Sequence, residues 1–300
     1  MKKTSFAILT LLSTLLLVGC KTDGVIDPKG PISSAQLNLM IFAAGVMLLV
    51  IIPVILMGIF FAFRYREGNK NAEYRPDFTH SNKIELVCWG IPILIIITLA
   101  IITYRTSHSL DPYRPLESDK DPVTIQVVSL DWKWLFIYPE QGIATVNTIT
   151  IPEDTPINFE ITSDAVMNSF WIPDLAGQIY AMAGMKTKLH LMADEPGVYD
   201  GKSTNYSGFG YAGMLFDVNA VKEDEFPKWV EQSKASANEL TLEGYNELRK
   251  QSRHNPQVVY SSAPADLFET ILLQYVDPKA EKIFDSNAPD PKSYGKIEGH

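Results

Sequence analysis

The chain has 300 residues, of which 26 are Lys or Arg and 35 are Asp or Glu, so its formal net charge at pH 7 is −9. This acidic balance argues against a nucleic-acid-binding protein, whose binding surface is basic. Hydrophobic residues make up an ordinary 46% of the chain, but two runs, 30–63 and 86–104, contain no charged residue. At about 1.5 Å per helical residue, even the shorter run nearly spans the roughly 30 Å core of a bilayer. The sequence therefore predicts a membrane protein.

Residues 1–19 have the layout of a secretory signal peptide, because Lys2 and Lys3 precede an apolar stretch that is too short to span a membrane. The stretch ends in Leu-Val-Gly-Cys, which resembles the lipobox of bacterial lipoproteins. That resemblance implies cleavage before Cys20 and lipidation of its thiol, while an ordinary signal with a chance cysteine is the alternative. The other cysteine, Cys88, lies inside the second apolar run, so the exported part holds no disulfide framework.

Residues 20–110 are predicted to form a lipidated N-terminus and a two-helix transmembrane hairpin. The two helices are expected over about 37–63 and 86–104. If Cys20 is anchored on the outer leaflet, the connecting segment 64–85 lies in the cytoplasm. That segment has five basic residues, whereas residues 111–300 hold 16 basic and 29 acidic residues. The positive-inside rule gives the same orientation, because Lys and Arg in short loops favour the cytoplasmic side.

Residues 111–221 have the two-residue periodicity of half-buried strands. Ile157, Phe159 and Ile161 alternate with polar residues, and clusters of Pro and Gly between such runs predict turns. We expect a small exported β-sandwich or barrel here. His190 falls in the polar phase of another strand, where an exposed side chain is favoured over a metal ligand.

Residues 222–276 return to helical spacing. Leu242, Tyr245 and Leu248 recur at intervals of three residues, which is typical of one face of an amphipathic helix. We therefore expect a helical C-terminal extension, followed by a polar, poorly ordered tail over 277–300.

The exported part lacks the residues for a redox or catalytic centre of its own. It contains three histidines and no cysteine, so neither a blue-copper centre nor a thiolate-bridged copper pair can be assembled. Ser207 has no glycine two residues before it, which excludes the nucleophile elbow of the α/β-hydrolases. No catalytic, cofactor-binding or metal-binding residue is assigned to this chain.

Three motifs that follow the helical hairpin resemble subunit II of the haem-copper respiratory oxidases. They are Asp-Trp-Lys-Trp at 131–134, Asn-Ser-Phe-Trp-Ile-Pro at 168–173, and the stretch from Ser203 to Met214. The resemblance covers about residues 20–220 and implies a cupredoxin-like fold. In the cytochrome c oxidases of this family, the third motif and an upstream His hold a dinuclear copper centre. The positions of this lost copper site are occupied here by Asn168, Ser203, Asn205, Ser207, Tyr211 and Met214.

Only Met214 among those six keeps the family's residue, and hydroxyl, amide and phenol groups do not replace the thiolates and imidazoles that hold copper. The chain is thus identified as a member of the quinol-oxidising branch, of the cytochrome bo type. The resemblance implies a non-catalytic subunit II of a proton-pumping quinol:oxygen oxidoreductase in a bacterial inner membrane. Haems, copper and ubiquinol would all be bound by subunit I. Other expected partners are further subunits and membrane lipid.

Two alternatives remain open from the sequence. One is a lipid-anchored periplasmic binding or scaffold module with no respiratory role. The other is a copper-containing subunit that oxidises cytochrome c, which the missing cysteines disfavour.

Glu85 directly precedes the second apolar run, at its cytoplasmic end. The resemblance implies that it lies at the mouth of a proton channel, because a His-Ser-Asn sequence at 80–82 precedes it. An interfacial flanking charge is the alternative interpretation. Trp132 and Trp134 match an aromatic cluster through which electrons arrive in the cytochrome c branch, but without copper a packing role is favoured.

Overall fold

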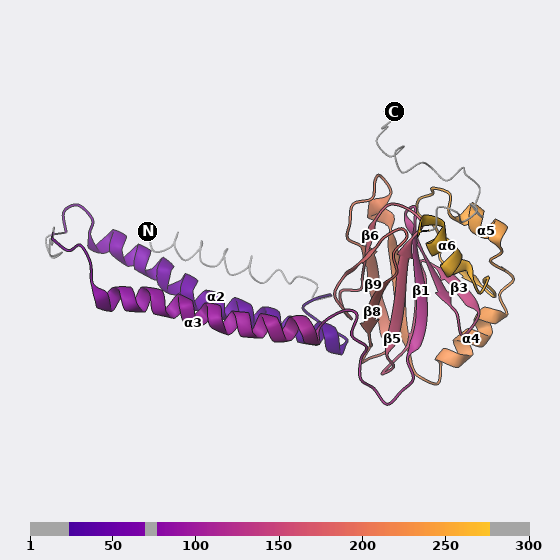
Figure 1. The fold of residues 1–300 in the computed structure, drawn as a ribbon, viewed down its shortest axis with the longest axis horizontal. Coiled ribbons are helices and arrows are strands. Elements are labelled where there is room, and N and C mark those ends of the chain that lie inside the picture. Colours follow the sequence, from indigo (N-terminus) through magenta and orange to yellow (C-terminus); the bar gives the residue numbers. More distant parts are fainter. Residues whose placement is uncertain (1–23, 70–76, 277–300) are drawn as a thin grey trace, which may run out of the picture. The chain divides into compact units, whose positions relative to one another are not determined.

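The computed structural model describes residues 24–69 and 77–276, which form two compact units. One is a helical unit over residues 35–114, and the other is a β unit built from residues up to 34 and from 115 onward. Figure 1 labels the elements of both units. The signal peptide, Cys20 and the tail 277–300 lie outside the described residues.

Two long helices, α2 (Pro31–Arg64) and α3 (Asn82–Ser109), contain the two uncharged runs. Their 34 and 28 residues correspond to about 51 Å and 42 Å of helix, which exceeds the roughly 30 Å bilayer core. Both helices extend beyond the apolar segments expected from the sequence, because polar residues continue the helical hydrogen bonding at each end. None of the residues in the most apolar stretch of either helix is buried within the protein, so these side chains are available to lipid or to neighbouring helices.

The β unit is a sandwich of two sheets, as the resemblance implied. One sheet has the strand order β11-β3-β2-β1-β5-β8, and the other has the order β4-β10-β9-β6-β7. The strands are β1 (Val123–Leu130), β2 (Lys133–Tyr138), β3 (Ile143–Val146), β4 (Thr148–Pro152), β5 (Ile157–Ser163), β6 (Asn168–Trp171), β7 (Ile179–Ala181), β8 (Thr187–Leu191), β9 (Gly197–Ser203), β10 (Leu215–Val221) and β11 (Val258–Tyr260). Because β1 is parallel to β5 and β10 is parallel to β4, while their other neighbours are antiparallel, both sheets are mixed.

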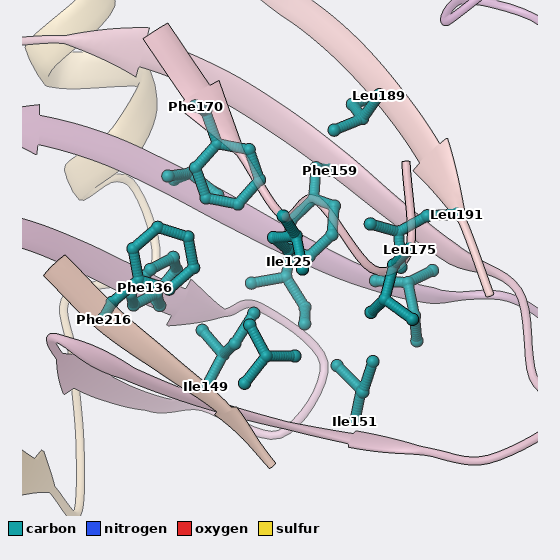
Figure 2. Packing of buried hydrophobic residues seen from close by; sticks show 14 of the residues in the cluster. Ile125, Phe136, Ile149, Ile151, Phe159, Phe170, Leu175, Leu189, Leu191 and Phe216 are labelled. Carbon is teal, nitrogen blue, oxygen red and sulfur yellow. The ribbon is translucent and has the colours of Figure 1, made fainter. Parts of the chain in front are cut away.

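The core between the two sheets follows from the alternation of side chains along each strand. Ile125 of β1 and Trp134 and Phe136 of β2 face inward and are fully buried. They meet Phe170 and Phe216 of the other sheet, whose rings stack with centroids 5.1 Å apart. Figure 2 shows the rings of Phe136 and Phe216 side by side in this core. Trp134 contacts both stacked rings, in agreement with the packing role that the sequence favours.

Most of the C-terminal extension covers the outer face of the six-stranded sheet, while Phe226 and Val230 at its start pack into the core between the two sheets. Its elements are α4 (Phe226–Lys234), α5 (Leu242–Leu248), the strand β11 and α6 (Leu267–Val276). Tyr245, Phe268 and Ile271 of the extension pack with Leu130 and Leu135 of the sheet in a second buried cluster. Figure 1 shows the three helices gathered on the side of the β unit where β3 lies. The extension is therefore not wholly helical, since β11 pairs with β3 at the sheet edge, a strand that the sequence analysis did not predict.

The short segment that precedes α2 also belongs to the β unit. The amide of Gly24 donates to a carboxylate oxygen of Asp174 (2.7 Å), and the Ser33 hydroxyl donates to the Asp174 carbonyl (2.7 Å). Gly30 lies so close to the chain that a Cβ there would be 2.4 Å from the carbonyl oxygen of Met192. Residues 24–34 therefore form a strap on the sandwich, whereas the sequence analysis assigned them only to the membrane anchor.

The exposure of the His190 side chain, in β8, differs from the expectation. Its neighbour Lys188 is exposed as the alternation predicts, but His190 is only 7% exposed. Alternation assigns a residue to one side of a strand without revealing whether another segment covers that side. The prediction of an exposed His190 was wrong for this reason.

Candidate functional site

The positions of the lost copper site gather at one end of the sandwich, where β6, β9 and β10 meet a loop over residues 204–214. Asn168 begins β6 and Ser203 ends β9, and both are buried. Met214 closes the loop and is 1% exposed, and its carbonyl accepts a hydrogen bond from the Ser203 amide (3.2 Å). The fold thus brings together three positions that are far apart in the sequence.

The Asn168 side chain is the centre of a hydrogen-bond chain. Its Nδ2 donates to Ser129 Oγ of β1 (2.8 Å), and its Oδ1 accepts from Ser203 Oγ (2.8 Å). An amide that donates on one side and accepts on the other links the two sheets without a charge. All three side chains are buried, so this network satisfies polar groups that would otherwise destabilise the fold.

The other three positions have different surroundings. The Ser207 hydroxyl is buried and has no hydrogen-bond partner within the described part of the chain. The Asn205 side chain donates to the Met167 carbonyl (2.9 Å), and the Tyr211 ring packs 5.8 Å from that of Tyr206.

These groups do not suit a copper centre. The set contains amide and hydroxyl oxygens, a phenol and one thioether, whereas copper in such sites is held by thiolates and imidazoles. In residues 24–69 and 77–276 no group of three His, Cys, Asp or Glu side chains is arranged to hold a metal ion. The chemistry open to this arrangement is structural hydrogen bonding.

Trp132 packs against the loop 204–214 through its side chain. Its backbone has a positive φ of 60°, and its indole Nε1 donates to the Ser207 carbonyl (3.1 Å). A Cβ at Gly210 would lie 2.2 Å from the indole ring, so only glycine permits the loop to approach this closely. Trp132 is itself 5% exposed, which indicates a packing role like that of Trp134.

Two buried charged residues that the sequence analysis did not single out join the sandwich to its extension. The first is Asp164, whose carboxylate accepts hydrogen bonds from Tyr245, Arg249, Gln274 and Tyr275 of the extension. Burial, and then the nearby Asp164 charge, raise the pKa of Tyr275 above its ordinary value. Asp164 follows directly on the strand β5, and its partners are more than 80 residues away, so no local pattern reveals the cluster.

The second is Lys133 of β2, which is fully buried. Its ammonium donates to the carbonyl of Lys250 (2.7 Å), the hydroxyl of Ser252 (2.6 Å) and the carbonyl of Asp131 (3.3 Å). Burial lowers the pKa of Lys133 from 10.5 to about 8, although the Asp131 charge acts in the opposite direction. The lysine of the Asp-Trp-Lys-Trp motif therefore holds the extension in place.

Glu85 lies in the first turn of α3, and its side chain is exposed in the helical unit. A carboxylate at this position also interacts favourably with the positive end of the helix dipole. The geometry is compatible both with a flanking charge and with a group that exchanges protons at the membrane surface.

Comparison with known proteins gives matches over both parts of the β unit. Residues 140–221 match the family described as the periplasmic domain of cytochrome c oxidase subunit II, and residues 234–279 match the COX aromatic rich motif. Cytochrome bo(3) ubiquinol oxidase subunit 2 of Pseudomonas putida is 57% identical over 270 residues, which cover 90% of this chain and 86% of that protein. Quinol oxidase subunit 2 of Bacillus subtilis is 37% identical and covers 98% of this chain and 89% of that protein.

Among solved structures, the periplasmic domain of subunit II of cytochrome oxidase from Bradyrhizobium japonicum is similar to 39% of this chain. The matched part of this chain covers 94% of that domain, with 22% sequence identity and a TM-score of 0.37.

Proposed function

Because this chain belongs to the family of subunit 2 of the cytochrome bo(3) ubiquinol oxidases, we propose that it supports the catalytic subunit of a ubiquinol:oxygen oxidoreductase without carrying electrons itself. The chain is a subunit of an oxidase complex, with two membrane-spanning helices and a cupredoxin-like domain in the periplasm. Ubiquinol, the haems and the copper beside the oxygen-reducing haem belong to subunit I in this proposal.

The observation that carries the proposal is the side chain of Asn168. The resemblance places it where a copper ligand stands in the copper-containing oxidases, and its amide forms hydrogen bonds of 2.8 Å to both Ser129 and Ser203. These hydrogen bonds satisfy the buried polar atoms of Asn168, Ser129 and Ser203, and amide and hydroxyl groups are not redox centres. The electron donor therefore acts on another subunit.

The loop 204–214 supplies a surface for that subunit. Tyr206 and Phe209 are 77% and 78% exposed, and Met167 lies beside Asn205 at the same end of the sandwich. Exposed aromatic side chains are enriched at protein interfaces. The domain is joined to two membrane spans, so a partner within reach is a membrane-embedded subunit. We propose that this patch of exposed side chains contacts the periplasmic surface of subunit I.

Two further roles are proposed for the membrane anchor. Glu85 admits protons at the cytoplasmic side, because it is an exposed titratable group at the start of a spanning helix. Cys20 carries a lipid that adds to the anchoring by α2 and α3. A single lipid chain gives only marginal membrane binding, so the two spans provide most of the anchoring.

The function is tested by purifying the chain in mild detergent from the membranes of cells that express it. We expect a haem protein to co-purify and the preparation to oxidise ubiquinol with consumption of oxygen. The isolated subunit is expected to contain no stoichiometric copper by metal analysis. Tight copper in the isolated subunit would overturn the proposal, and so would a preparation without haem, which would favour a periplasmic scaffold.

A further inference from the structure

The loop 204–214 has little regular structure of its own to hold its shape. It contains a single turn of 3-10 helix, at Tyr211–Gly213, between the strands β9 and β10. The hydrogen bond from Trp132 to the Ser207 carbonyl fixes one side of the loop. Its other side, at Phe209, faces the C-terminal extension.

The extension contacts this loop through two consecutive residues. The guanidinium of Arg253 lies 4.0 Å from the ring centroid of Phe209 and 5.4 Å from that of Trp132. His254 has a positive φ of 51°, and its imidazole lies 3.3 Å from the position of a Cβ on Gly213. Arg253 thus joins the exposed aromatic residue of the loop to the buried aromatic residue beneath it.

Within residues 24–69 and 77–276, these two rings are the contacts of the Arg253 guanidinium. No carboxylate of the described residues lies within ion-pair distance of its guanidinium, although the chain is acidic overall. A cation over an aromatic face is attracted by the ring's quadrupole, and a planar guanidinium also stacks on it. A planar guanidinium therefore suits the position between the two rings.

The segment that carries Arg253 is itself fixed to the sandwich. Arg249 at its start forms a double hydrogen bond with Asp164, and Lys133 binds the carbonyl of Lys250 and the hydroxyl of Ser252. At its end, the Asn147 side chain donates to the carbonyl of Asn255 (3.0 Å). Residues 249–255 are therefore tied to the sandwich at their start, middle and end.

We propose that residues 249–255, which we call the brace, hold the loop 204–214 in the conformation that binds subunit I, and that Arg253 is the positioning residue of this contact. The brace takes the part that bound metal ligands would play in fixing such a loop. The identity of the binding partner rests on the proposed function above, but the fixing of the loop does not.

The first test measures how often the loop opens. Chymotrypsin cleaves after exposed aromatic residues, and Tyr206 lies in the loop outside the contact with Arg253. In the full-length chain purified alone in detergent, we expect Arg253→Ala to raise the rate of cleavage after Tyr206 roughly two- to fivefold, the factor that corresponds to an exposed cation–π contact. Lys228→Ala is the matched control, because that exposed side chain pairs with Asp224 at the start of α4, outside the brace. The control is expected to leave the rate unchanged.

A double-mutant cycle shows whether Arg253 acts through the ring. We expect Phe209→Ala to raise cleavage after Tyr206 by a similar factor, and the double variant to add little more. Independent, multiplicative effects of the two substitutions would overturn the stacking contact as the means of fixing the loop.

The second test measures assembly, as the amount of the chain that stays bound to the haem-containing subunit during purification. We expect Arg253→Ala to lower this amount, and Lys228→Ala to leave it at the wild-type level. Faster cleavage with full retention would support the brace and contradict the docking surface of the proposed function. Unchanged cleavage would overturn the brace, whatever the retention.

Discussion

Asp164 and Lys133 are both charged and buried, and both form hydrogen bonds with the C-terminal extension. Asp164 accepts these bonds, whereas Lys133 donates them. Burying a charge is unfavourable unless it is paired or fully hydrogen-bonded. Asp164 is paired with Arg249 and with three neutral donors, whereas the three protons of the Lys133 ammonium meet two carbonyls and a hydroxyl. The two residues are therefore expected to respond differently to mutation and to pH.

Replacing Asp164 with Asn leaves the Arg249 guanidinium buried without a compensating charge. We expect Asp164→Asn to lower the free energy of unfolding by about 3–5 kcal/mol, as for other buried ion pairs with one partner removed. Thermal unfolding of the full chain in detergent measures this. Asp224→Asn is the control, because Asp224 and Lys228 form an exposed pair on one helical turn. Equal melting temperatures of the two variants would contradict a stabilising role for Asp164.

Lys133 gives the stability a dependence on pH. Its pKa is about 8 in the folded protein, below the ordinary 10.5, so the unfolded chain binds more protons between these values. The free energy of unfolding contributed by Lys133 therefore rises as the pH increases through 8. We expect urea unfolding between about pH 8 and pH 9 to show this rise, below the range in which tyrosines titrate. In Lys133→Met the rise is expected to disappear, and an unchanged slope would contradict the assignment.

At the scale of elements, four of the positions that the resemblance assigns to a lost copper site, Asn168, Ser203, Ser207 and Met214, are buried at one end of the sandwich. Asn168 and Ser203 lie within hydrogen-bond distance, and Met214 and Ser207 are buried beside them in the loop that follows β9. If these positions form one ligand set, as the resemblance implies, side chains of suitable chemistry there would share an ion.

Restoring the ligands tests this arrangement. We expect the variant Asn168→His, Ser203→Cys, Ser207→Cys and Tyr211→His to bind two copper ions and to become intensely coloured, since thiolates and imidazoles are suitable ligands for copper. Copper analysis and the visible spectrum measure both effects in the purified chain, and the unmodified chain is the control. A folded variant without copper would mean that the four positions do not converge.

Sequence patterns predicted the helices and strands in which the same face is apolar along the whole element. The uncharged runs gave the two helices, and the two-residue alternation gave strands such as β5, because each is covered on one defined face. The strand β11, the strap over 24–34 and the burial of His190 depend on segments far away in the sequence. The ligand positions were identified only through motifs, and the links made by Asp164 and Lys133 gave no local signal.

At the scale of the whole molecule, the chain has parts in two environments: a pair of helices that span the membrane and a sandwich in the periplasm. Its contribution to an oxidase is therefore measured on the assembled complex. Catalytic turnover reports on the membrane part, while assembly reports on the sandwich and its brace.

Glu85 is the residue of the membrane part to test in this way. We expect Glu85→Gln to slow quinol oxidation several-fold while haem content and assembly stay normal, because the change removes the titrating group and almost preserves the shape. The control is Glu67→Gln, which alters an exposed carboxylate of the segment that joins the two helices. If Glu85→Gln turns over at the wild-type rate, Glu85 is only a flanking charge.

The hydrogen bonds of Asn168 have a consequence for how the subunit is made. A domain whose ligand loop is organised by a metal reaches its final form only after the metal has been delivered, so its maturation depends on supply and on delivery proteins. Here the corresponding region is held together by hydrogen bonds among Ser129, Asn168 and Ser203. These side chains are part of the polypeptide itself and need no separate delivery. We therefore expect the periplasmic domain to fold after export without any metal, even in cells that are starved of copper.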